Sequence, residues 1–163
     1  MKSWYVITHN LHGYHVVTSK IAHLGVEVYA PTMVEIKRRK DCKGIRVSEK
    51  QLFPGYLFLR FDHEMVHTTS ISDIPGVKDF VRSGVQIATV SDDLIEALKQ
   101  SVSLSADRSV STLECKNVSQ ETMDKLRSIT QMRSQVDRQA ALFSLIENDK
   151  WIERPFSRIT SAN

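Results

Sequence analysis

The first hundred residues alternate between strand-like and helix-like stretches of apolar positions. Ser3–His9 is aromatic and β-branched, which predicts a buried strand, and Tyr14–His23 carries apolar residues at helical spacing before Gly25. Further strands are predicted at residues 26–36 (broken near Pro31), 45–48, 56–61 and 77–82, a short helix at 63–71, and a helix capped by Ser91 or Asp92 that runs through Leu98. Strands joined by tight turns, with helices on one side, indicate an α+β fold.

The remainder of the chain lacks turn residues and is predicted to be helical. No glycine follows Gly84, and residues 101–117 are serine-rich with weak periodicity, which predicts a linker. Ser119 can cap a helix, and a second helical stretch ends before Pro155; a single long helix is the alternative, but a helical hairpin is favoured because it buries two narrow stripes together. The two stripes are Met123, Leu126, Ile129, Met132 and Val136, and then Leu142, Leu145, Ile146 and Ile152.

Both faces of the predicted strand Tyr56–Phe61 are apolar. Alternation places Leu57, Leu59 and Phe61 on one face and Tyr56, Phe58 and Arg60 on the other. The second face, together with Phe53, therefore needs a cover of its own, which the carboxy-terminal helices or another protein could supply. A single compact core that uses both faces is the alternative.

Composition is that of an ordinary globular protein, with 163 residues, 41% hydrophobic and 25% charged. No apolar run is long enough for a membrane span or a signal-peptide core, so we expect a cytoplasmic protein that has no membrane partner. Cys42 and Cys115 have no metal-binding or CxxC spacing, which favours free thiols.

Positive charge is concentrated in the first half of the chain. Residues 1–84 carry 12 Lys and Arg against 8 Asp and Glu, whereas residues 85–163 carry 10 against 11. The predicted hairpin tip at 37–44 is basic and could contact nucleic-acid phosphates, although a solvated loop would have the same composition. The candidate contacts are Lys37, Arg38, Arg39, Lys40, Lys43 and Arg46, with Lys20 and His23 expected on a neighbouring helix face.

No pattern of catalytic or metal-ligating residues is present. His9, His12 and His15 recur at three-residue spacing, but no HExxH, Cys/His quartet or carboxylate cluster completes a metal site. A GxSxG nucleophile motif and a glycine-rich phosphate loop are also missing. We therefore expect neither an enzyme nor a cofactor.

Several short motifs in order resemble the amino-terminal domain of NusG-type transcription factors. They are SWYVI at 3–7, Ala30-Pro31, LFPGYLFLRFD at 52–62, HTT at 67–69 and GVKDFVRSG at 76–84, and the HTT and FVR elements look most like the specialised RfaH-like antitermination branch. The resemblance covers about residues 3–100. It implies a four-stranded antiparallel sheet flanked by helices, with the domain at 1–100, a linker at 101–117 and a carboxy-terminal region at 118–163.

The resemblance implies a factor that travels with bacterial RNA polymerase. Phe53, Tyr56 and Phe58, with Ile95 at the rim, match the surface that binds the clamp helices of the β′ subunit. His67, Thr68 and Thr69 match residues that contact the gate loop of the β subunit. Contact with the non-template DNA strand is also implied, but Asn10, Leu11, Val16, Val17 and Pro75 depart from the residues that read a specific DNA element in RfaH-like factors.

The carboxy-terminal region resembles the helical hairpin with which RfaH-like factors cover their polymerase-binding surface. Leu142, Leu145 and Ile146 match the covering residues, and Glu49 and Arg138 match positions that pair across the interface. Because the region lacks the glycines of the KOW β-barrel, the resemblance gives little support for refolding to a barrel or for recruiting a ribosomal protein.

Overall fold

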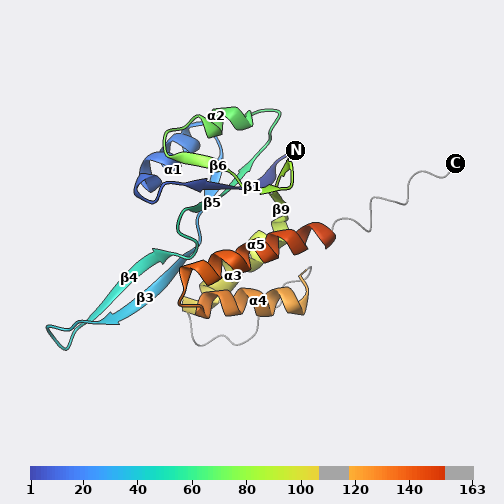
Figure 1. The fold of residues 1–163 in the computed structure, drawn as a ribbon. Helices are drawn as coiled ribbons and strands as arrows, with labels where there is room; N and C mark the ends of the chain where they lie inside the picture. The colour runs from blue at the N-terminus through green and yellow to red at the C-terminus, as the bar shows by residue number, and fades with distance from the viewer. Residues whose placement is uncertain (107–117, 153–163) are drawn as a thin grey trace.

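The computed structural model describes residues 1–106 and 118–152. A central antiparallel sheet has the strand order β2 (Glu27–Tyr29), β5 (Tyr56–Phe61), β1 (Ser3–His9) and β6 (Val77–Phe80), and the short strand β9 (Thr89–Val90) also pairs with β1 (Figure 1). The sheet thus contains one strand more than the four that were predicted. The predicted α+β class is confirmed.

The alternation along β1 and β5 creates two separate hydrophobic cores. Trp4 and Val6 face one core together with Phe58, whereas Tyr5 and Leu59 face the other. The antiparallel register aligns Val6 with Phe58 and Tyr5 with Leu59, so neighbouring strands present matching faces. Consecutive apolar residues in β1 (Trp4 to Ile7) and β5 (Tyr56 to Leu59) fit a sheet that is buried on both sides.

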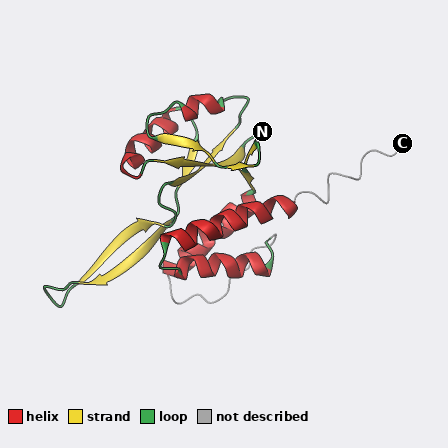
Figure 2. Cartoon of the chain, in the orientation of Figure 1, coloured by secondary structure: helices red, strands yellow, loops and turns green. Residues whose placement is uncertain are grey.

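Helices cover both faces of the sheet, whereas the sequence pattern predicted helices on one side (Figure 2). The first side holds the 3₁₀ turn η1 (Leu11–Gly13), α1 (Tyr14–His23) and α2 (Thr68–Ser72). The second side holds α3 (Asp92–Ala106), α4 (Gln120–Gln131) and α5 (Gln135–Ile152). The second layer of helices forms because α3 packs on that face of the sheet, and α4 and α5 extend the same hydrophobic core.

A two-stranded ribbon extends away from the sheet. It consists of β3 (Thr32–Arg38) and β4 (Ile45–Gln51), which pair only with each other (Figure 1). Lys37 and Arg38 lie within β3 rather than in the predicted tip, so the turn is shorter than expected. The small hairpin of β7 (Arg82–Ser83) and β8 (Gln86–Ile87) splits the predicted strand at 77–82.

The boundaries of two other predicted elements change. The helix predicted at 63–71 begins only at Thr68, because Asp62 accepts backbone bonds from Met65 and Val66 in a preceding turn. α3 continues to Ala106, so the predicted linker begins too early at 101. Residues 107–117, including Cys115, and the predicted helix end at Pro155 lie outside the described residues.

The favoured helical hairpin is confirmed. Ser119 caps α4 by accepting a hydrogen bond from the backbone N–H of Thr122 (3.2 Å). Met132 then adopts an extended conformation (φ −67°, ψ 128°), which ends α4 without glycine or proline. Val136, which was expected on the buried stripe, is 70% exposed because this break shifts the helical phase. Within the described residues, no helix is long and apolar enough to cross a membrane.

Gly76 packs where no side chain fits. Its φ is +98°, and an added Cβ would lie 2.8 Å from Cγ2 of the buried Val17 on α1. We expect Gly76→Ala to lower the free energy of unfolding by about 1–3 kcal/mol from backbone strain alone, with the clash adding to it. Gly84→Ala is the matched control, because Gly84 also has a positive φ (+64°) but nothing within 4 Å. Urea denaturation should show the larger loss for Gly76→Ala, and equal losses would contradict the packing argument.

Candidate functional site

The aromatic face of β5 forms a continuous apolar surface with the segment that precedes it. We call Phe53, Tyr56, Phe58 and Ile95 the aromatic surface. Phe58 packs against Phe53 (ring centroids 6.5 Å apart) and against Tyr29 of β2 (5.9 Å). Burial, with a smaller contribution from Glu96, raises the pKa of Tyr29 to about 12, so its phenol stays neutral beside the rings. The local cause of this surface is the Pro54-Gly55 turn, which directs Phe53 onto the same face as Phe58.

The carboxy-terminal helices cover the aromatic surface. Phe53 and Phe58 are 2% and 1% exposed, and they share one hydrophobic cluster with residues of α3, α4 and α5. Tyr56 is partly exposed and meets Phe143 of α5 edge-on, with ring centroids 5.7 Å apart. The covering side chains are Met123, Leu126 and Ile129 of α4 and Leu142, Leu145 and Ile146 of α5.

The structure therefore answers the question of what covers the second face of β5. The cover is the chain's own helical hairpin, one of the two covers the sequence allowed. Ile95 is not at a rim: it is 1% exposed, on the face of α3 that points into the cluster. Removing α4 and α5 would leave α3 against the sheet and expose one side of the aromatic surface to solvent.

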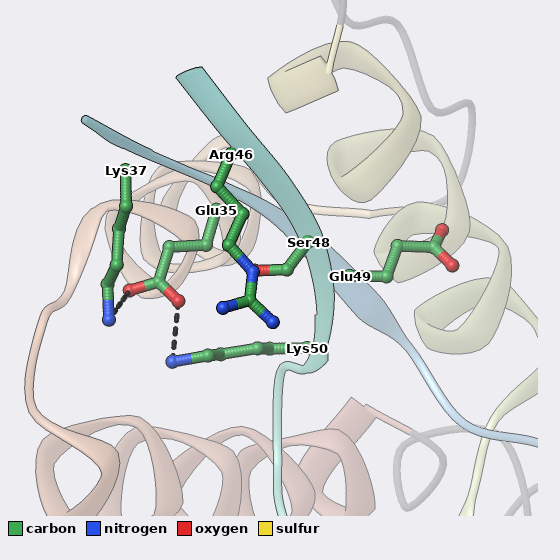
Figure 3. A pocket seen from close by; sticks show the side chains of 6 residues that line it. All are labelled: Glu35, Lys37, Arg46, Ser48, Glu49 and Lys50. Carbon is green, nitrogen blue, oxygen red and sulfur yellow. Dashed lines mark ion pairs between the residues drawn. The ribbon is translucent and has the colours of Figure 1, made fainter. Parts of the chain in front are cut away.

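Arg138 joins α5 to the first half of the molecule, but not through Glu49. Its Nε donates to the carbonyl of Leu52 (2.8 Å), and its Nη1 donates to the carbonyls of Met132 (2.8 Å) and Arg133 (3.4 Å). The expected Glu49–Arg138 ion pair is absent within the described residues. In Figure 3 the Glu49 side chain points away from Glu35 and Lys50, and among the described residues it accepts a hydrogen bond from the Thr32 hydroxyl (3.5 Å). Register explains this, because Glu49 and Lys50 lie on opposite faces of β4.

A second polar contact holds the other end of α5. Asp149 accepts hydrogen bonds from the backbone N–H and the hydroxyl of Ser91, both at 2.7 Å. The Ser91 hydroxyl in turn accepts from the N–H of Leu94, so it caps α3 as predicted. The sequence analysis missed Asp149, although its spacing from Leu142, Leu145 and Ile146 places it on the same helical face.

The HTT residues lie on the opposite side of the sheet from the covering helices. His67 precedes α2 as its N-cap: its Nδ1 accepts from the N–H of Thr69 (3.4 Å) and lies 2.8 Å from Thr69 Oγ1. His67 and Thr69 are exposed and Thr68 is partly exposed. This end of the molecule stands apart from α4 and α5 (Figure 1), so the helical hairpin leaves it open.

The basic residues fall into two separate groups. Lys20 and His23 are exposed on α1, whereas the other candidate cations lie on the ribbon, which extends away from the sheet near the carboxy-terminal helices (Figure 1). On the ribbon, Glu35 pairs with Lys37 (3.1 Å) and Lys50 (2.5 Å), as Figure 3 shows, and hydrogen bonding to Lys50 and then Lys37 lowers the pKa of Glu35. The other ribbon cations, Arg38, Arg39, Lys40, Lys43 and Arg46, have no carboxylate partner among the described residues.

The described residues hold no cluster of three or more potential metal ligands among His, Cys, Asp and Glu. His9 is buried and its Nδ1 lies 2.8 Å from the carbonyl of Asn10, while Cys42 is an exposed free thiol.

Comparison with known proteins matches this architecture to one family. Residues 2–99 match the family model described as "Transcription termination factor nusG". Among solved structures, the chain is similar to one described as "Domain interaction in Thermotoga maritima NusG", with 25% sequence identity and a TM-score of 0.37. That match covers 60% of this chain and 55% of the other, so the chain spans little more than half the length of that relative.

Proposed function

Because the chain belongs to the NusG family of transcription factors, we propose that it is an elongation factor that binds bacterial RNA polymerase and suppresses pausing and termination in specific long operons. Proteins of this family are transcription factors and not enzymes, in agreement with the sequence expectation. The observation that carries the proposal is the aromatic surface of the matched region, which α4 and α5, outside that region, cover together with α3.

The aromatic surface is the proposed docking site for the β′ clamp helices. Clustered aromatic side chains are the residue types that dominate binding energy at protein interfaces. Phe53, Tyr56 and Phe58 project from one turn and one strand, so their positions relative to one another are rigid. An amphipathic helix pair of the polymerase would occupy the place that α4 and α5 now hold.

The exposed HTT residues are the proposed contact with the β gate loop. His67, Thr68 and Thr69 stay accessible whether or not the helical hairpin covers the aromatic surface. A protein that contacts both sides of the DNA channel stabilises the closed clamp by its differential affinity for that state. Pausing and termination, which require clamp opening, become less frequent.

The helical hairpin is the proposed autoinhibitory element, as in RfaH-like factors. It buries the aromatic surface in a shared core and is fastened at both ends of α5, by Arg138 and by Asp149. The polymerase must therefore compete with an intramolecular partner. Its apparent affinity for the protein is lowered in proportion to the fraction of molecules in which the helical hairpin has left the aromatic surface.

The exposed cations of the ribbon support contact with the DNA of the elongation complex, by salt-sensitive and sequence-independent contacts to phosphates. They also support the alternative function, a nucleic-acid-binding protein in which the ribbon alone accounts for binding. Tight binding to duplex DNA at physiological salt in the absence of polymerase would favour the alternative.

Transcription in vitro through pause and terminator sites tests the proposed function. Added protein should increase readthrough on at least one template that carries a candidate leader sequence, and unchanged readthrough on all templates would contradict the proposal. His67→Ala should reduce the readthrough gain about two- to twelvefold and leave polymerase retention unchanged, because a lost hydrogen bond costs about 0.5–1.5 kcal/mol. His63→Ala, at an exposed histidine outside HTT, is the matched control.

A further inference from the structure

A cavity of about 370 Å³ lies where the base of the ribbon meets the turn between α4 and α5. Glu35 and Lys50 line it from the ribbon, and Thr130, Arg133 and Arg138 line it from the carboxy-terminal helices. It therefore lies between the two halves of the molecule, and its lining includes Met33 and Met132, which pack against the cluster that contains the aromatic surface. Its volume is within the range of small-molecule sites.

Arg138 brings an uncompensated positive charge to this cavity. The residue is only 9% exposed, and within the described part of the chain its guanidinium meets three carbonyl oxygens and no carboxylate. Its printed hydrogen bonds come from Nε and Nη1, and Nη2 is not among the buried atoms that lack a partner, so the N–H groups of Nη2 are open to solvent and available to a ligand. A buried cation that lacks a counter-ion is costly, and an anion is the group that relieves the cost.

Two further cations face the same cavity. Arg133 has no carboxylate partner among the described residues, and Lys50 is paired only with Glu35, which it shares with Lys37. The lining thus holds three cationic side chains against one carboxylate. The three come from three separate segments, β4, the α4–α5 turn and α5, so they surround the cavity instead of forming a flat patch.

We propose that this cavity binds a small phosphate-bearing anion, such as a pyrophosphate or the polyphosphate group of a nucleotide. Guanidinium groups donate in a planar fork that suits phosphate oxygens, and Lys50 adds a point charge beside them. A small ligand fits better than a polynucleotide, because the site is a cavity walled on two sides by different parts of the fold.

The cavity is lined by both the ribbon and the helical hairpin, so ligand binding affects the position of the hairpin. A ligand that contacts both Lys50 and Arg133 bridges the ribbon and the helical hairpin, so it binds only while the hairpin is in place. Binding therefore stabilises the covered arrangement by mass action. The binding itself is measured on the free protein, so it does not depend on the proposed function in transcription.

Calorimetric titration of the full chain with inorganic pyrophosphate and with ATP, at constant ionic strength, tests the proposal. We expect saturable 1:1 binding and a rise in melting temperature. Arg133→Ala should weaken binding by about tenfold or more, because the ligand loses charge-assisted hydrogen bonds. Arg127→Ala, at an exposed arginine of α4 outside the cavity, should leave binding unchanged. Glu35→Gln should strengthen binding, because it removes the only negative charge from the lining.

Three results would overturn the proposal. The first is the absence of saturable binding of either probe to the wild-type chain. The second is an equal loss of affinity in Arg127→Ala and Arg133→Ala, which would indicate nonspecific attraction to a basic surface. The third is binding to duplex DNA that Arg133→Ala weakens while neither small probe binds, which would assign these cations to nucleic acid.

Discussion

Replacing Leu142 with Asp should raise retention of the protein by bacterial RNA polymerase by about tenfold or more. Leu142 is 2% exposed and packs in the cluster that contains Phe53 and Phe58. An uncompensated carboxylate in such a place costs about 3–5 kcal/mol, and this cost falls only on the covered arrangement. The helical hairpin should therefore leave the aromatic surface and make it available for docking.

Ser144→Asp is the matched control, because it adds the same charge two residues away on the exposed side of α5. Polymerase pull-down should show the gain for Leu142→Asp only. Adding Tyr56→Ala and Phe58→Ala to Leu142→Asp should abolish the gain if the aromatic surface is the docking site. Retention that is equal for wild type and Leu142→Asp would show that the hairpin does not block binding, and retention that survives both alanine changes would place docking elsewhere.

Replacing Arg138 with Leu should lower the free energy of unfolding by about 2–4 kcal/mol, because hydrogen bonds to a charged donor are lost and buried carbonyls are left without a partner. Arg138→Lys should not restore the loss, since an ammonium cannot present the two donors that reach Leu52 and Met132 at once. Urea denaturation, with limited proteolysis of α4 and α5 as a second readout, measures both effects.

Glu49→Gln is the decisive comparison for this contact. Because Glu49 is exposed and makes no ion pair with Arg138, its replacement should change stability by no more than about 0.5 kcal/mol. Equal losses in Glu49→Gln and Arg138→Leu would instead indicate the ion pair that the family resemblance implies, and would contradict the carbonyl contacts described above.

The strands of the matched region were predictable because their signals are local. Ser3–His9 contains the apolar run Trp4 to Ile7, Tyr56–Phe61 is apolar at every position but Arg60, and Pro54-Gly55 marks the turn before the second strand. The helical hairpin was predictable for the same reason, from its narrow apolar stripes and the Ser119 cap. β9 was missed because a two-residue strand has no periodicity of its own and forms only by pairing with β1.

The candidate site was predictable in part. The two apolar faces of β5 showed that Tyr56 and Phe58 required a second cover, but the pattern could not choose between this chain and another protein. The hydrogen-bond partners of Arg138 could not be predicted either, because they are backbone carbonyls. Every residue has a carbonyl group, and the position of the Leu52 carbonyl depends on the whole fold.

Sequence alone determined most of the segments that form strands and helices, that one strand is apolar on both faces, and that the described part of the carboxy-terminal region is helical. These properties follow from the spacing of apolar residues within a few turns or strand lengths. Tertiary structure alone decided that α4 and α5 occupy the aromatic surface, that Arg138 meets carbonyls while Glu49 faces away, and that three cations surround one cavity. These contacts depend on how segments distant in the sequence pack together. Hydrophobic burial is not directional, so many packing arrangements would bury the same set of apolar residues.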